Sequence, residues 1–129
     1  MLELFQKKKK EKPPYLERLD ELKNVSIVRF KGNIDQSMIP TIEARIKSNR
    51  QSGSKIDKNV LLDFAKVERV DSATIAFHIV RLHEYQQKGF KIGFVHVPQV
   101  MRYMLEMFKE NGAFKIYDSE EEAIKELDR

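Results

Sequence analysis

"VERVDSATIAFHIVRL", residues 67–82, changes its hydrophobic pattern in the middle. Apolar residues alternate with polar ones up to Val70, as in a β-strand, and from Ile75 onward they recur at helical spacing. An acid and two hydroxyls stand at the change, at Asp71, Ser72 and Thr74. The stretch therefore predicts a strand followed directly by a helix, with a polar turn between them.

Other strands are predicted on both sides of this stretch. Residues 25–32 alternate as a half-buried strand does, while residues 59–64 and 91–97 are short, continuous apolar runs typical of buried strands. A short strand is expected at residues 114–118. Residues 15–23 have leucines at helical spacing, but they also fit a strand joined to residues 25–32 by a turn at Lys23-Asn24, and we favour this hairpin.

Helices are predicted between the strands. The first covers roughly residues 38–50, the second runs from residue 72 to 88 and ends at Gly89, and the third opens at Pro98 and ends at Asn111-Gly112. Ser119 and Glu122 form a capping box for a last helix. This order predicts an α/β domain with a small mixed, mostly parallel sheet of four to five strands and about four helices.

Composition limits the function. The chain has 129 residues, enough for one domain, and it lacks cysteine, which excludes disulfides, thiolate zinc sites and a cysteine nucleophile. Of the net charge of +4, residues 1–12 carry five lysines against two acids, or +3, so the rest carries only +1. We therefore expect no nucleic-acid partner. No apolar run could span a bilayer and no signal peptide is recognisable, which predicts a cytoplasmic protein.

The first fourteen residues are predicted to be a basic, flexible tail, and the domain to cover residues 15–129. Pro13-Pro14 ends the tail, and its lysines lie between Lys7 and Lys12. A solvated extension is the simpler interpretation. The lysines beside Leu2, Leu4 and Phe5 could instead make weak contact with an anionic membrane surface.

No catalytic or metal-binding pattern is present. His78 and His83 are five residues apart, about 140° around a helix, rather than the four that align two metal ligands, and His96 is expected at a surface or edge. Hydrolase, phosphate-loop and dinucleotide motifs are also missing from the sequence. We therefore predict no enzyme activity, no catalytic residue, no metal site and no cofactor.

The methionine-rich segment "VMRYMLEMF", residues 100–108, has two interpretations. Val100, Met104, Met107 and Phe108 fit a face that packs on the sheet, which we favour. Methionine is also adaptable enough to form a binding groove.

Several short motifs occur in a characteristic order. They are Gly-x-x-Asp at residues 32–35, Leu-Asp-Phe at 62–64, Val-Asp-Ser at 70–72, Lys-Gly at 88–89, the glycine at 112 and "YDSEEEAI" at 117–124. Together they resemble the sulfate transporter and anti-sigma-factor antagonist (STAS) domain over residues 25–124, and most closely its stand-alone anti-sigma-factor antagonists.

The resemblance implies a non-enzymatic regulatory binding domain in a partner-switching signalling pathway. Its partner would be an anti-sigma factor or a kinase-like protein, and phosphorylation of a serine or threonine by that kinase would break the complex. The alternative is a cytoplasmic STAS domain or accessory subunit of an anion or lipid transport system, with a membrane permease as partner.

The resemblance also assigns site residues. The residue whose hydroxyl is usually phosphorylated in the family aligns with Ala73, which has no hydroxyl. The phosphorylation candidates that remain are Ser72 and Thr74, and Ser72 matches a shorter family pattern. The predicted partner-binding residues are Asp35, Asp71, Ser72, Ala73, Thr74 and Phe77.

A helix N-terminus suits a phosphate. Its charge, added beside Asp71 and any neighbouring acids such as Asp35 or Asp63, would repel a partner that binds the neutral state. The alternative is that Asp71 or Ser72 only caps the helix.

Overall fold

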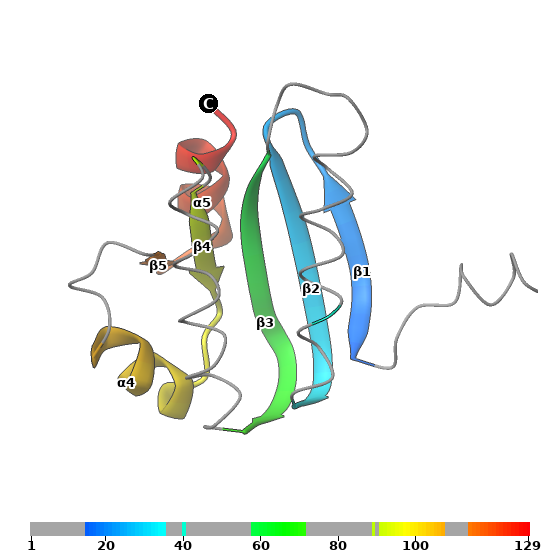
Figure 1. Ribbon diagram of the computed structural model, residues 1–129, viewed down its shortest axis with the longest axis vertical. Coiled ribbons are helices and arrows are strands. Elements are labelled where there is room, and N and C mark those ends of the chain that lie inside the picture. The colour runs from blue at the N-terminus through cyan, green and yellow to red at the C-terminus, as the bar shows by residue number, and fades with distance from the viewer. Residues whose placement is uncertain (1–14, 36–39, 41–57, 72–88, 90, 108–113) are drawn as a thin grey trace, which may run out of the picture.

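The computed structural model describes residues 15–35, 40, 58–71, 89, 91–107 and 114–129. Five strands and two helices lie in this part of the chain: β1 (Leu16–Glu21), β2 (Val25–Ile34), β3 (Asn59–Val70), β4 (Ile92–Val95), α4 (Gln99–Met107), β5 (Lys115–Tyr117) and α5 (Glu120–Leu127). The strands form one sheet in the order β1-β2-β3-β4-β5 (Figure 1). Apart from residue 40, which is helical, the predicted helices over residues 38–50 and 72–88 lie outside the described residues, as does the predicted tail.

The sheet is mixed, as predicted. β2, β3, β4 and β5 are parallel, while β1 pairs antiparallel with β2 at the edge. The expected hairpin is therefore present, and its turn is closed by the Leu22 N–H, which donates to the Val25 carbonyl over 2.9 Å. The strand interpretation of residues 15–23 is correct because pairing with β2 outweighs the helical spacing of the leucines.

One face of the sheet carries the larger core. Alternate residues of β2, β3 and β4 point to this face, and four aromatic rings cross it in a row: Phe30, Phe64, Phe94 and Phe114. Neighbouring ring centroids are 5.3, 5.9 and 5.3 Å apart. Rings at these separations attract each other beyond the effect of burial alone.

α4 packs on this core with a different face from the predicted one. Met101 and Leu105 are buried and join the cluster of Phe94 and Phe114, whereas Val100 and Met107 are exposed. The prediction that Val100 and Met107 face the core is wrong. The segment contains two overlapping apolar pairs at i and i+4 spacing, 100/104 and 101/105. Both members of the second pair are buried, whereas in the first pair only Met104 packs against the core, where it is half-buried.

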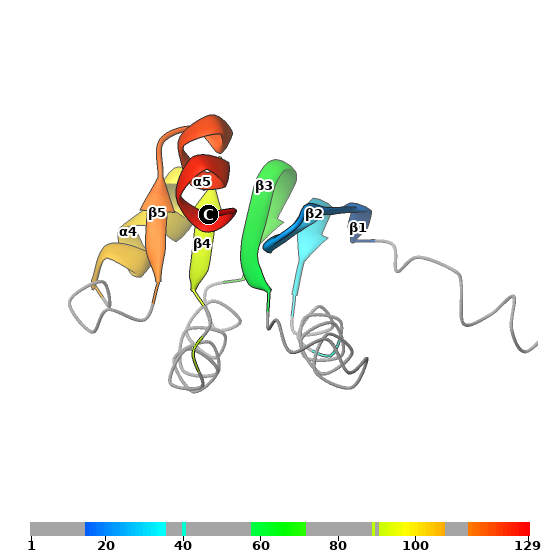
Figure 2. The same ribbon diagram turned by 90° about the horizontal axis from the view of Figure 1, so that it is seen from above.

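α5 covers the opposite face, above the row of strands in Figure 2. Its Ala123 and Leu127 pack with Ile27, Leu61 and Val95. The capping box is confirmed at the serine, since the Glu122 N–H donates to Ser119 Oγ over 3.2 Å.

The hairpin turn also binds the C-terminus. The Asn24 N–H donates to Asp128 Oδ1 over 2.6 Å, and Asn24 Nδ2 donates to the Arg129 carbonyl over 2.9 Å. The turn therefore fixes the end of α5 to the antiparallel edge of the sheet.

Candidate partner-binding site

The carboxyl ends of β2 and β3 bring two of the predicted site residues together. Ile34 pairs with Val70, and the Asp71 N–H donates to the Ile34 carbonyl over 3.2 Å. Asp35 and Asp71 follow directly, one after each strand, and both are exposed. In open parallel sheets, this end is where ligands and partners most often bind.

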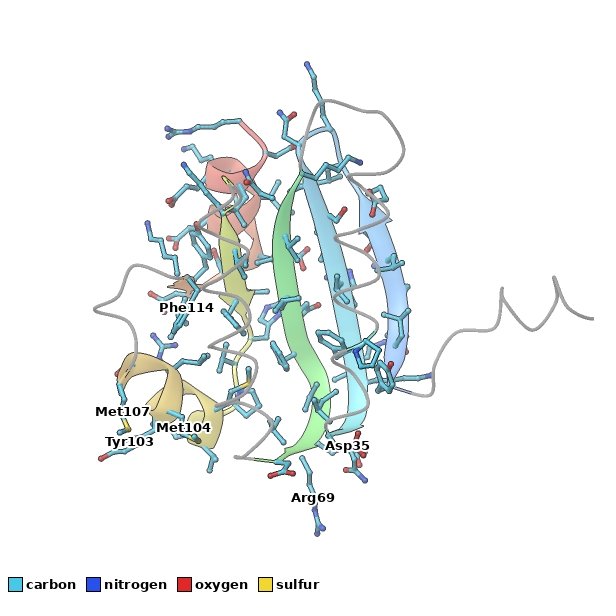
Figure 3. All side chains as sticks on the ribbon, in the orientation of Figure 1. Asp35, Arg69, Tyr103, Met104, Met107 and Phe114 are labelled. Carbon is cyan, nitrogen blue, oxygen red and sulfur yellow. The ribbon has the colours of Figure 1, made fainter. Side chains whose placement is uncertain are left out.

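The other predicted site residues, Ser72, Ala73, Thr74 and Phe77, lie outside the described residues. The structure adds a residue that the sequence reasoning did not select. Arg69 is exposed beside this end and pairs in register with Asn33 (Figure 3). The sequence signal was a charged residue two positions before Asp71.

Asp63 does not belong to this end of the sheet. It lies within β3, eight positions before Asp71, or about 25 Å along an extended strand. Its side chain is only 7% exposed. Asp63 therefore lies away from Asp71, because β3 continues well past the Leu-Asp-Phe motif.

Asp63 instead belongs to a charge cluster around Arg29, at the N-terminus of α5. Arg29 Nε donates to Asp20 Oδ2 over 2.6 Å, and Arg29 Nη1 donates to Asp63 Oδ2 over 2.7 Å. The guanidinium also donates through both Nη atoms to the carboxylate of Glu120. One arginine therefore joins β1, β3 and α5.

Burial would raise the pKa of Asp63, but hydrogen bonds from His96, from the Ala65 N–H and from Arg29 outweigh it and hold this pKa below its usual value. His96 Nδ1 lies 2.8 Å from Asp63 Oδ1. The backbone of His96 has a φ of 56°, a conformation in which histidine is enriched among non-glycine residues. This bond holds the imidazole against Asp63.

The donor atoms of Asp63, His96 and Glu120 lie within 4.8 Å of one another, close enough for a shared cation. Arg29 already supplies a positive charge there, since it bonds both carboxylates. A cavity of about 240 Å³ opens beside the cluster, lined partly by Lys66 and Ala65. The described residues that line it include no hydroxyl or thiol.

The sequence matches the STAS domain family over residues 18–123. The chain belongs to the STAS domain family. Among curated proteins, none matches this sequence. In the part of this STAS domain that the structure describes, helices are too short or too polar to span a membrane.

Solved structures that share the fold include the following three. SpoIIAA from Bacillus, a cell fate determinant in its phosphorylated form, is 20% identical, with 85% of this chain and 97% of that chain covered and a TM-score of 0.63. The anti-sigma factor antagonist SpoIIAA in its unphosphorylated form is 19% identical, with 85% and 96% covered and a TM-score of 0.63.

The third is an anti-sigma factor antagonist from Mycobacterium paratuberculosis, which is 16% identical, with 87% of this chain and 92% of that chain covered and a TM-score of 0.60. At these identities the likeness concerns the fold. It agrees with the mixed five-stranded sheet of this STAS domain.

Proposed function

We propose that this STAS domain is a non-enzymatic, cytoplasmic binding protein of the anti-sigma-factor antagonist type, whose partner is an anti-sigma factor or a related kinase-like protein. The observation that carries the proposal is the side-by-side placement of Asp35 and Asp71 at the carboxyl ends of β2 and β3. Two exposed acids and the exposed Arg69 give a partner charged groups to recognise at this end.

Regulation would act through Ser72. Ala73 has no hydroxyl, so phosphate in this turn can be carried only by Ser72 or Thr74. A phosphoryl group on Ser72 would add a charge close to −2 directly after Asp71 and would repel a partner that binds the unmodified acidic surface. SpoIIAA, which shares the fold, has been solved in both phosphorylated and unphosphorylated forms, which supports a switch of this kind.

Partner capture from the source cell tests the binding surface. Ala73→Arg and Phe77→Asp should each weaken capture by at least about 2 kcal/mol, as substitutions at the centre of an interface do. Ala65→Arg is the matched control, because Ala65 is exposed on β3 but lies away from the strand end. Unchanged capture by folded Ala73→Arg and Phe77→Asp variants would place the interface elsewhere, and capture of a permease would indicate the transport role instead.

Phosphorylation needs a separate experiment. Incubation with the captured kinase and phosphopeptide mapping should place phosphate on Ser72. Ser72→Asp should release the partner, while Ser72→Ala should retain it. Phosphate on Thr74, or none on either residue with full partner binding, would contradict the proposed switch.

A further inference from the structure

α4 has an exposed apolar stripe, formed by Val100, Tyr103 and Met107. Among the described residues, four large hydrophobic side chains are exposed, and three of them are in this stripe, with exposed fractions of 65%, 72% and 69%. At 3.6 residues per turn, the three positions fall within about 60° of arc. Figure 3 shows Tyr103 and Met107 projecting from α4 away from the sheet.

The two flanks of the α4 stripe differ in character. Arg102 and Glu106 lie together on one flank, 3.4 Å apart, and Arg102 also contacts Asp118 over 3.2 Å. Met104, which is half-buried, lies on the other flank. The helix therefore presents apolar side chains at its centre, opposite charges one turn apart on one side and a thioether on the other.

We infer that the α4 stripe binds a second copy of this chain, with the two helices antiparallel across a two-fold axis. The two-fold axis would pass between the two helices, level with the midpoint between residues 103 and 104 of each copy. Val100 of each copy then lies opposite Met107 of the other, and the two Tyr103 side chains meet beside the axis. A two-fold interface requires such self-complementarity, because the same patch serves both partners.

Charge selects this orientation. In the antiparallel pair, the charged flanks of the two copies lie on the same side of the interface, and Arg102 of one copy is within one helical position of Glu106 of the other. In a parallel pair, Arg102 would be level with Arg102 of the second copy, and each charged flank would face an apolar one. Of the two orientations, only the antiparallel one allows two ion pairs between the copies, each between Arg102 of one copy and Glu106 of the other.

The dimer should be weak. Three exposed side chains on a nine-residue helix make a small contact, and interfaces below about 1,200 Å² form transient complexes. We therefore expect a dissociation constant above about 1 µM. This inference uses none of the residues assigned to the strand-end site and does not depend on the proposed function.

Charge reversal gives the decisive experiment. Sedimentation equilibrium of the full chain from about 10 µM to about 1 mM should show a monomer–dimer equilibrium. Arg102→Glu alone and Glu106→Arg alone should each weaken self-association at least about tenfold, because four like charges then gather on one flank. An equal mixture of the two variants should recover dimerisation, since each copy supplies the charge that the other needs.

Two further variants keep the result interpretable. Tyr103→Asp changes an exposed side chain, so it should leave the thermal unfolding temperature unchanged and weaken the dimer at least about tenfold. Lys125→Glu makes a charge reversal at an exposed position of α5 and should leave self-association unaltered. A wild-type chain that stays monomeric at every concentration, or dimers that survive Tyr103→Asp, would overturn the inference, as would a mixture no more associated than its two components.

Discussion

Arg29 shows how much of this domain depends on one side chain. Its side chain is 15% exposed, and its guanidinium contacts carboxylates from β1, β3 and α5, of which that of Asp63 is almost fully buried. Buried ion pairs are not strong stabilisers compared with apolar packing, but removing one member leaves an uncompensated charge. The cluster should therefore be sensitive to loss of the arginine.

Arg29→Met should lower the free energy of unfolding by about 3 kcal/mol, because it leaves Asp63 and Glu120 without their cation. Arg18→Met is the matched control: Arg18 bonds the same Asp20 over 2.9 Å but is 61% exposed, so its loss should cost less than about 1 kcal/mol. Urea denaturation of both variants measures the difference. Equal losses would show that burial of the cluster does not matter to its energy.

The same cluster predicts the response to acid. The pKa of Asp63 is lower in the folded state than in the unfolded chain, where it is about 3.9. Its stabilisation is therefore fully present above pH 4 and is lost as the pH falls through the folded-state pKa. Asp63→Asn should be less stable than wild type at pH 7 and should lose less stability between about pH 5 and pH 2. Parallel slopes of unfolding free energy against pH would contradict this assignment.

At the scale of elements, the sequence determines where strands occur more clearly than which side chains meet. The alternation in β2 and the capping box of α5 were sufficient to predict both elements, since each signal is local. The face of α4 was predicted wrongly, because the segment contains two apolar pairs at the same helical spacing. The sequence alone does not show which pair is buried against the sheet. The Arg29 cluster, with the His96 bond to Asp63, was missed because its members come from five segments whose register no local pattern encodes.

The contacts of β4 with β5 and α5 predict a sensitive glycine. A Cβ atom added to Gly93 would lie 2.6 Å from Tyr117 Cε2 and 3.0 Å from Leu127 Cδ1, both in buried residues. Gly93→Ala should therefore cost about 1–3 kcal/mol through overpacking. Adding Tyr117→Val should make room, so the double variant should lose less than the sum of the two single changes in denaturant unfolding. Strict additivity would show that the ring is not the obstacle.

At the scale of the whole molecule, the described part of the core starts at β1, with Leu16 as its first buried residue. The sequence predicts a solvated extension over residues 1–14, so their removal should leave the thermal unfolding temperature unchanged, because such an extension adds little to a core. A loss of several degrees, or a loss of liposome binding on removal, would assign the lysines between Lys7 and Lys12 a role beyond a solvated tail.

The order of the sheet bears on how the chain folds while it is being synthesised. Each strand lies beside the one made just before it, so the sheet can grow from β1 towards β5 as the chain leaves the ribosome, without waiting for a distant segment. α5 is the exception, because its final residues must return to Asn24 in the first hairpin. Until α5 has left the ribosome, Arg29 has no Glu120 to bind and the face under α5 remains exposed to water, so docking of α5 is the step that completes this side of the domain.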